Sequence, residues 1–79
     1  MEDSKIYLHC NLKKYLDKVG LSANAFAKLI EERRSTINDL INNKDMDTRR
    51  IPARLIAKIC HELDITPSEL FEVRNNQEE

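Results

Sequence analysis

The chain of 79 residues contains one glycine, two prolines and no tryptophan. Few residues therefore break the backbone, while leucine, isoleucine, lysine and glutamate are common, and this balance favours a helical domain. No apolar run approaches the roughly 20 residues that a membrane-spanning helix needs. The sequence thus predicts one small domain with no membrane contact, whose core removes only about 60% of the unfolded surface from water.

Cysteine is also scarce, since Cys10 and Cys60 are the only two. Each adjoins a histidine, His9 or His61, which raises the alternative of a metal site. However, adjacent helical residues point about 100° apart, and the CxxC spacing of zinc sites is absent. We therefore predict that both cysteines are small core residues, that His61 faces solvent, and that no metal or other cofactor is bound.

Charge of one sign does not dominate, because the formal net charge is −1 and the isoelectric point is about 6.1. The distribution is uneven, however: residues 33–58 hold seven basic and three acidic side chains, and residues 62–79 hold six acidic and one basic. The chain also lacks a nucleophile motif and a glycine-rich phosphate loop, so we do not expect an enzyme. With no signal peptide, a cytoplasmic protein with reduced thiols is expected.

In the first half of the chain, apolar residues recur at the spacing of one helix face. The pattern predicts helices over 11–19, 22–30 and 34–42, with Asn11 and Ser22 as N-terminal caps. Gly20 and either Asn42 or Asn43 are expected to take the left-handed conformation that ends a helix. The predicted buried residues of these helices are Leu12, Tyr15, Leu16, Val19, Ala23, Phe26, Ala27, Ile30, Ile37, Leu40 and Ile41.

The second half begins with a polar loop over 43–50 and predicts two further helices. Pro52 suits the first turn of a fourth helix. The buried face of that helix is predicted to consist of Ile56, Ile59, Cys60 and Leu63. The motif "TPSEL" at 66–70 predicts a fifth, short helix with a capping box between Thr66 and Glu69. Residues 5–8 either form a brief strand paired with 71–74 or lie as a packed, extended arm.

The order of these elements resembles the helix-turn-helix of the Cro/CI-like (lambda-repressor-like) DNA-binding family. The resemblance covers residues 11–73 and rests on "LSANAFAKLI", "RRSTINDLINNK" and "RLIAKICHELDITPSELFEV". It implies an all-α fold, a compact bundle of about five short helices with one lambda-repressor-like DNA-binding domain. Residues 1–10 would be an N-terminal arm or short strand, and residues 74–79 a frayed polar tail.

The resemblance also implies that helix 34–42 enters the major groove of double-stranded DNA. Arg34 is the strongest candidate for a base contact, and Asp39 can accept a hydrogen bond from cytosine N4. The implied base contacts are Arg34, Ser35, Asn38 and Asp39. The implied phosphate contacts are Ser22, Arg33, Thr36, Asn42, Asn43, Lys44, Arg49 and Arg50.

The chain departs from the family at the turn of the motif, where Glu31 stands in place of the usual glycine. Either Glu31 takes the glycine's backbone conformation with some strain, or the first motif helix runs on into a looser turn. Glu31 and Glu32 are also expected to pair with Lys28, Arg33 or Arg34. These acids lie near the positive end of the recognition helix.

The functional expectation is a transcriptional regulator of bacterial or phage origin, with repression by promoter occlusion as the favoured mode. Ala23 replaces a phosphate-contacting glutamine of many relatives, so we expect weak DNA binding helped by dimerisation or a protein partner. The alternative is a protein-interaction module that keeps the helix-turn-helix fold without binding DNA. Glu31, Glu32, Asp39 and the acidic C-terminal segment favour that alternative.

Apolar residues outside the predicted core faces leave two further alternatives open. Leu29 either packs under the N-terminal arm or marks a partner surface. Near the C-terminus, four apolar residues either complete the core or form a homodimer contact through the last helix region. These four residues are Ile65, Leu70, Phe71 and Val73.

Overall fold

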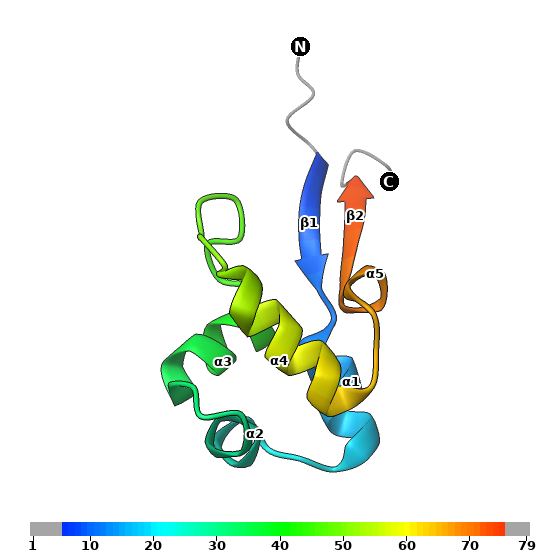
Figure 1. Cartoon of the computed structure of the whole chain (residues 1–79). Coiled ribbons are helices and arrows are strands. Elements are labelled where there is room, and N and C mark those ends of the chain that lie inside the picture. The colour runs from blue at the N-terminus through cyan, green and yellow to red at the C-terminus, as the bar shows by residue number, and fades with distance from the viewer. Residues whose placement is uncertain (1–5, 76–79) are drawn as a thin grey trace.

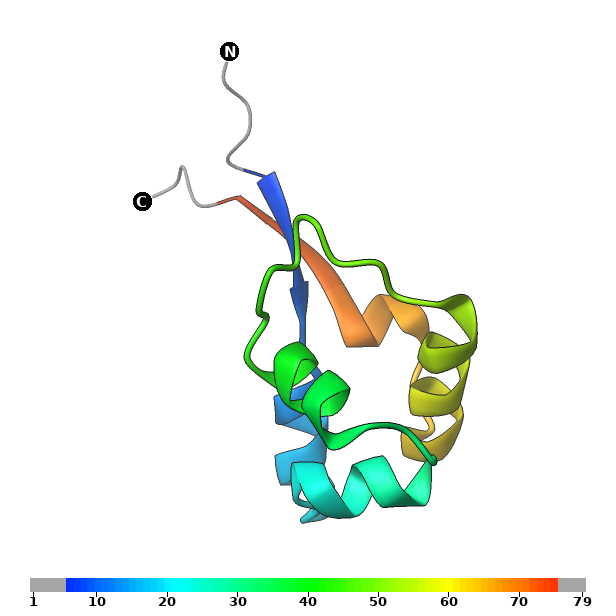
Figure 2. The same cartoon turned by 90° about the vertical axis from the view of Figure 1, so that its left-hand side faces the viewer.

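The helices form one body from which a two-stranded ribbon projects (Figures 1 and 2). The computed structural model describes residues 6–75. In chain order the elements are β1 (Ile6–Cys10), α1 (Leu12–Val19), α2 (Ala23–Leu29), α3 (Arg34–Ile41), α4 (Ala53–Leu63), α5 (Pro67–Leu70) and β2 (Phe71–Asn75). The five predicted helices are confirmed. The arm and tail predictions for residues 1–5 and 76–79 lie outside the described residues.

The ribbon makes the all-α prediction wrong in one respect. β1 and β2 form a two-stranded antiparallel sheet in which Ile6 lies opposite Asn75 and Cys10 lies opposite Phe71. The strand alternative for the N-terminal segment is therefore correct, and β2 includes Arg74 and Asn75, which the sequence assigned to a frayed tail. Each strand has only five residues, so neither shows a strong local pattern, and their pairing is a contact between distant parts of the chain.

The core lies between the helices and reaches the base of the ribbon. It confirms both cysteines as core residues, and burial raises the pKa of the Cys10 and Cys60 thiols. Val19 is 53% exposed, contrary to its predicted place on a buried face, and Leu55 rather than Ile56 is fully buried on α4. The buried residues are Cys10, Leu12, Leu16, Phe26, Ala27, Ile30, Ile37, Leu40, Leu55, Ile59, Cys60 and Leu70.

Most of the predicted helix ends are confirmed. Gly20 is left-handed at the end of α1, with φ 76°. The Ser22 hydroxyl accepts a hydrogen bond from the Ala25 N–H at 3.1 Å. Thr66 and Glu69 form the reciprocal capping box that starts α5. Pro52 differs from the prediction in that it is the N-cap residue, one position before α4 begins.

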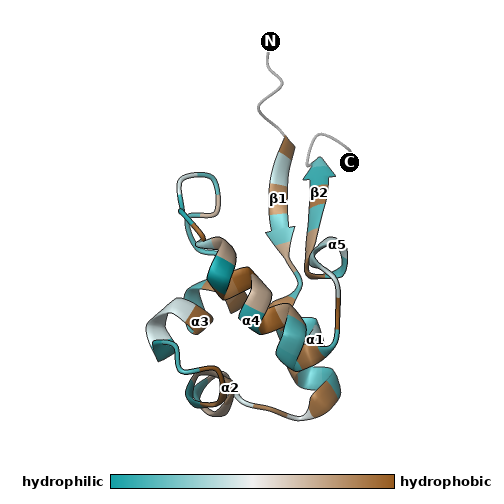
Figure 3. Ribbon diagram, in the orientation of Figure 1, coloured by the Kyte–Doolittle hydropathy of each residue, from teal (hydrophilic) through white to brown (hydrophobic). Residues whose placement is uncertain are grey.

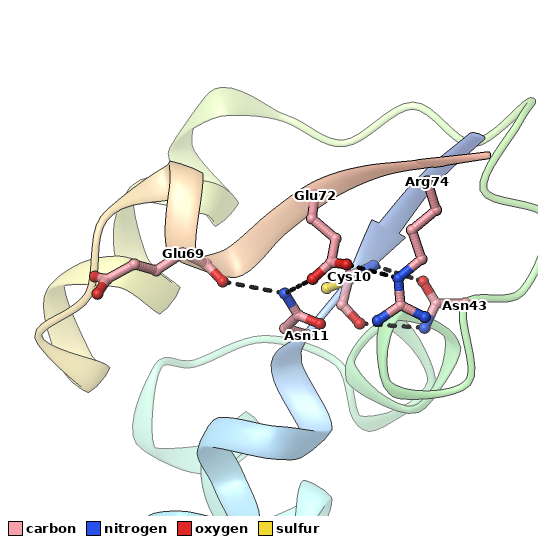
Figure 4. A network of polar contacts seen from close by, with 6 residues as sticks. All are labelled: Cys10, Asn11, Asn43, Glu69, Glu72 and Arg74. Carbon is pink, nitrogen blue, oxygen red and sulfur yellow. Dashed lines mark hydrogen bonds and ion pairs between the residues drawn. The ribbon is translucent and has the colours of Figure 1, made fainter. Parts of the chain in front are cut away.

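Asn11 is the N-cap residue of α1 but does not cap it with its side chain. Its amide instead donates to the Glu69 carbonyl at 3.2 Å and to Glu72 Oε1 at 3.0 Å, as Figure 4 shows. The Arg74 guanidinium, together with this amide, lowers the pKa of the Glu72 carboxyl. Asn11 therefore ties the start of α1 to α5 and β2.

Candidate nucleic-acid interface

Helices α2 and α3 form a helix-turn-helix whose turn depends on Glu31. Its φ is 58°, so the residue occupies the left-handed region, and the alternative of a longer first helix with a looser turn is wrong. The next N–H, that of Glu32, donates to the Ala27 carbonyl at 2.8 Å. This backbone bond closes the end of α2 and turns the chain so that Ile37 of α3 lies in the core.

Helix α3 presents a polar face to solvent. Ile37 and Leu40 are completely buried, whereas Arg34, Ser35 and Asn38 are exposed. At about 100° per residue, Ser35, Asn38 and Asp39 project away from the buried pair. The sequence-predicted base-contacting residues therefore lie on one surface of α3, together with the exposed Asn42 just after it.

The N-terminus of α3 has no side-chain cap. Arg33 is the N-cap residue and makes no capping hydrogen bond, and the first backbone bond of the helix runs from the Ile37 N–H to the Arg33 carbonyl at 3.2 Å. Within residues 6–75, the N–H groups of Arg34, Ser35 and Thr36 thus have no partner in the protein. Such a helix end attracts anions, and Arg33 and Arg34 add two positive charges there.

Asp39, on the outward side of α3, is paired with Arg49 from the following loop. Arg49 Nη2 donates to Asp39 Oδ2 at 2.7 Å. Arg49 Nε also donates to the Lys44 carbonyl at 3.2 Å. The sequence placed Asp39 among the base contacts and Arg49 among the phosphate contacts, and it gave no sign that the two residues meet.

Glu32 is also paired, but not with the residues that the sequence suggested. Its Oε2 accepts from Lys58 Nζ of α4 at 2.9 Å. The expected pairing with Lys28, Arg33 or Arg34 is not among the ion pairs of the described residues. Because Lys58 is 26 positions away in the sequence, only the packing of α4 against the motif brings it to this carboxylate.

Asn43 is also engaged within the protein (Figure 4). It is left-handed, with φ 54°, which confirms one of the two predicted helix ends. Its Oδ1 accepts from the Cys10 N–H at 2.6 Å, and its Nδ2 donates to the Cys10 carbonyl at 3.2 Å. The side chain thus pairs with the backbone of β1 as a neighbouring strand would and links the end of α3 to the ribbon.

The remaining sequence-predicted contacts lie around α3 with different degrees of exposure. Thr36 is half-buried, whereas Ser22, Lys44 and Arg50 are exposed. Neither Lys44 nor Arg50 has a side-chain partner within residues 6–75. The loop that carries these residues is largely hydrophilic in Figure 3. Arg54 is an exposed basic residue at the start of α4 that was not among the sequence-predicted contacts. Its only signal in the sequence is its place in the basic stretch 33–58.

Two other kinds of feature, a metal-binding cluster and a membrane-spanning helix, are absent from the part of the chain that the structure describes. No three residues among its histidines, cysteines, aspartates and glutamates come together in a way that could hold a metal ion. Its helices include none with the length and hydropathy required to cross a membrane.

The left-handed turn, the buried contact between α2 and α3 and the exposed polar face of α3 define a helix-turn-helix domain. A family model described as "Cro/C1-type HTH DNA-binding domain" matches residues 11–75. The chain therefore belongs to the Cro/C1-type helix-turn-helix DNA-binding family. No curated protein matches it.

Proposed function

We propose that this protein is a sequence-specific regulator of transcription that reads the major groove of duplex DNA with α3. The observation that carries the proposal is the exposed polar face of α3 beside an uncapped, positively charged helix N-terminus. Base edges in the major groove display both donors and acceptors. We propose Arg34, Ser35, Asn38 and Asp39 as the residues that contact them.

The proposed phosphate contacts surround this face. Arg33 and the free N–H groups at the start of α3 suit one phosphate, because the helix dipole and the guanidinium act together. We leave Asn43 and Arg49 out of this set because each side chain already has two hydrogen bonds within the protein. The proposed set is Ser22, Arg33, Thr36, Asn42, Lys44 and Arg50.

The mode of action follows from family membership and remains part of the proposal. A protein bound across a promoter would block RNA polymerase there, so we propose a cytoplasmic repressor of bacterial or phage origin. The rival function is a protein-interaction module that has lost DNA binding. In its favour, Leu29 is 52% exposed and so is not covered by the described part of the N-terminal segment.

We also propose a homodimer, but through the ribbon rather than the last helix. Leu70 is completely buried and Phe71 packs against the core, so neither is available for a partner. Ile6 is 58% exposed, Leu8 39% and Val73 73%. Leu8 lies opposite Val73, and side chains alternate along a strand. The three side chains therefore lie on the same face of the ribbon as Cys10. Apolar colour is visible in both strands in Figure 3.

The test of the function is selection of binding sites from random duplexes at low salt, followed by measurement of affinity against salt concentration. We expect enrichment of a short motif and a steep loss of affinity with salt, because each neutralised phosphate releases counterions. An inverted repeat with half-sites about 10 base pairs apart would indicate a dimer. Absence of enrichment with folded protein would instead favour the interaction module.

A further inference from the structure

An acidic side chain at the centre of a DNA-contacting surface needs a physical explanation. Phosphate groups repel a free carboxylate, yet Asp39 lies on the outward side of α3. Arg49, which pairs with it, is ten positions later in the sequence, after the turn at 42–48. The side chains of Arg49 and Asp39 are 22% and 29% exposed, so the pair is partly shielded from solvent.

Several hydrogen bonds hold the pair in one arrangement. The Lys44 N–H donates to the Asp39 backbone carbonyl at 2.9 Å, and the Lys44 carbonyl accepts from Arg49 Nε at 3.2 Å. The Arg49 N–H in turn donates to the Asp45 carbonyl at 2.9 Å. The loop is thus folded back on α3, and two of the five N–H donors of the Arg49 guanidinium are used within the protein.

The ion pair neutralises the charge of the carboxylate but leaves one of its oxygens able to accept a hydrogen bond. Arg49 uses Oδ2, which leaves Oδ1 without a partner among the described residues. In the major groove the exocyclic amino groups of cytosine (N4) and adenine (N6) are donors, whereas guanine O6 and N7 and thymine O4 are acceptors. A fixed carboxylate oxygen can therefore accept from cytosine or adenine and is repelled by the other two bases.

We propose that Arg49 is a positioning residue for specificity, which holds Asp39 so that its carboxylate accepts from the amino group of cytosine or adenine at one base pair. The proposal rests on the proposed function, since it assumes that α3 lies in the major groove. It explains why an acid is compatible with this surface and gives Arg49 a role other than a phosphate contact.

The experiment repeats the selection from random duplexes with the full-length chain and three variants, Asp39→Ala, Arg49→Gln and Arg50→Gln. Arg50→Gln is the matched control, because it removes the same charge from an exposed neighbour that has no partner within residues 6–75. Thermal unfolding followed by circular dichroism checks that each variant is folded at the binding temperature.

We expect Asp39→Ala and Arg49→Gln to weaken the preference at the same single base pair by about fivefold or more, because alanine removes the acceptor and glutamine removes its ion pair. Arg50→Gln should lower the affinity for all sequences alike and reduce the salt slope by about one. Arg49→Gln should leave the salt slope unchanged, which a phosphate contact could not do.

Two other outcomes separate this inference from the function itself. If the wild-type chain selects a motif but Arg49→Gln keeps every base preference, Arg49 does not position Asp39, and a salt slope reduced as in Arg50→Gln would make Arg49 a phosphate contact. The inference is then overturned while the function stands. If the folded wild-type chain selects no motif, the proposed function fails and the inference fails with it.

Discussion

At the scale of single residues, Gly20 and Glu31 adopt the same left-handed backbone conformation at different energetic cost. Gly20, with φ 76°, is a residue type that adopts the conformation freely, and no atom lies within 4 Å of the position where a Cβ would be added. Glu31, with φ 58°, adopts it with a side chain attached. A residue other than glycine in this region is strained by roughly 1–2 kcal/mol.

This contrast predicts opposite effects of two substitutions on the free energy of unfolding. Glu31→Gly should stabilise the protein by up to about 1 kcal/mol, because released strain exceeds the entropy that glycine adds to the unfolded chain. Gly20→Ala should destabilise it by about 1 kcal/mol, through strain alone, since space is available. Urea unfolding measures both, and destabilisation by Glu31→Gly would show that the glutamate side chain makes a net stabilising contribution.

Arg34 and Arg50 test the division between base and phosphate contacts. Arg34→Ala should weaken binding to the selected site by about 1–3 kcal/mol and relax the preference at one position, because a bidentate contact to guanine is lost. Arg50→Ala should weaken binding to selected and random duplexes by the same factor. Fluorescence anisotropy with both duplexes distinguishes the two effects, and equal losses for Arg34→Ala on both would remove it from the proposed base contacts.

At the scale of secondary-structure elements, Asn43 joins the end of α3 to β1. Its amide satisfies both the N–H and the carbonyl of Cys10, at 2.6 and 3.2 Å. Two backbone groups on the outer edge of β1 therefore depend on one side chain from another element. An unsatisfied buried polar group costs about 1–3 kcal/mol.

We accordingly expect Asn43→Ala to destabilise the protein by about 1–3 kcal/mol and to loosen α3. Alanine is also less favourable than asparagine in the left-handed conformation at this position, which lowers the stability further. Asn42→Ala is the matched control, because Asn42 is exposed and is the C-cap residue of α3, next to Asn43. Chemical unfolding compares the two variants, and hydrogen exchange at the His9, Cys10 and Asn11 amides shows whether the link is broken. Equal stability of both variants would mean that water replaces the Asn43 amide without loss.

At the scale of the whole molecule, the ribbon extends beyond the helical body with an apolar face that carries no charged side chain. The exposed area of its three apolar side chains, Ile6, Leu8 and Val73, is well below the roughly 800 Å² that each partner buries in a standard interface. A dimer that buries only these side chains would therefore be weak in free solution. Two half-sites on one DNA duplex would raise the effective concentration of one copy near the other.

We expect Val73→Lys to abolish cooperative binding to a two-half-site duplex while leaving the affinity for a single half-site unchanged. The charge would be placed in the centre of the proposed contact. Val19→Lys is the control, because Val19 is 53% exposed on α1, away from the ribbon. Mass measured by light scattering, with and without DNA, reports the assembly. Retained cooperativity in Val73→Lys would place the dimer contact elsewhere.

The local parts of the fold were predictable because their causes are local. The spacing of apolar residues specified the five helices, and Ser22, Gly20 and the Thr66 capping box specified helix ends, since each acts within a few residues of itself. The ribbon was predicted only as one of two alternatives, because its pairs join residues 61 to 69 positions apart. No local pattern distinguishes a paired strand of five residues from an extended arm.

The sequence by itself determined the five helices and their apolar faces, because periodicity and caps encode these directly. Its resemblance to the Cro/CI-like family indicated the helix-turn-helix and the outward face of α3. Only the tertiary structure decided which of the charged and polar side chains there are free. It pairs Asp39 with Arg49, Glu32 with Lys58 and Asn43 with the Cys10 backbone. These contacts arise where the loop and α4 pack against the motif, and a side chain's availability to DNA depends on such neighbours rather than on its own position in the sequence.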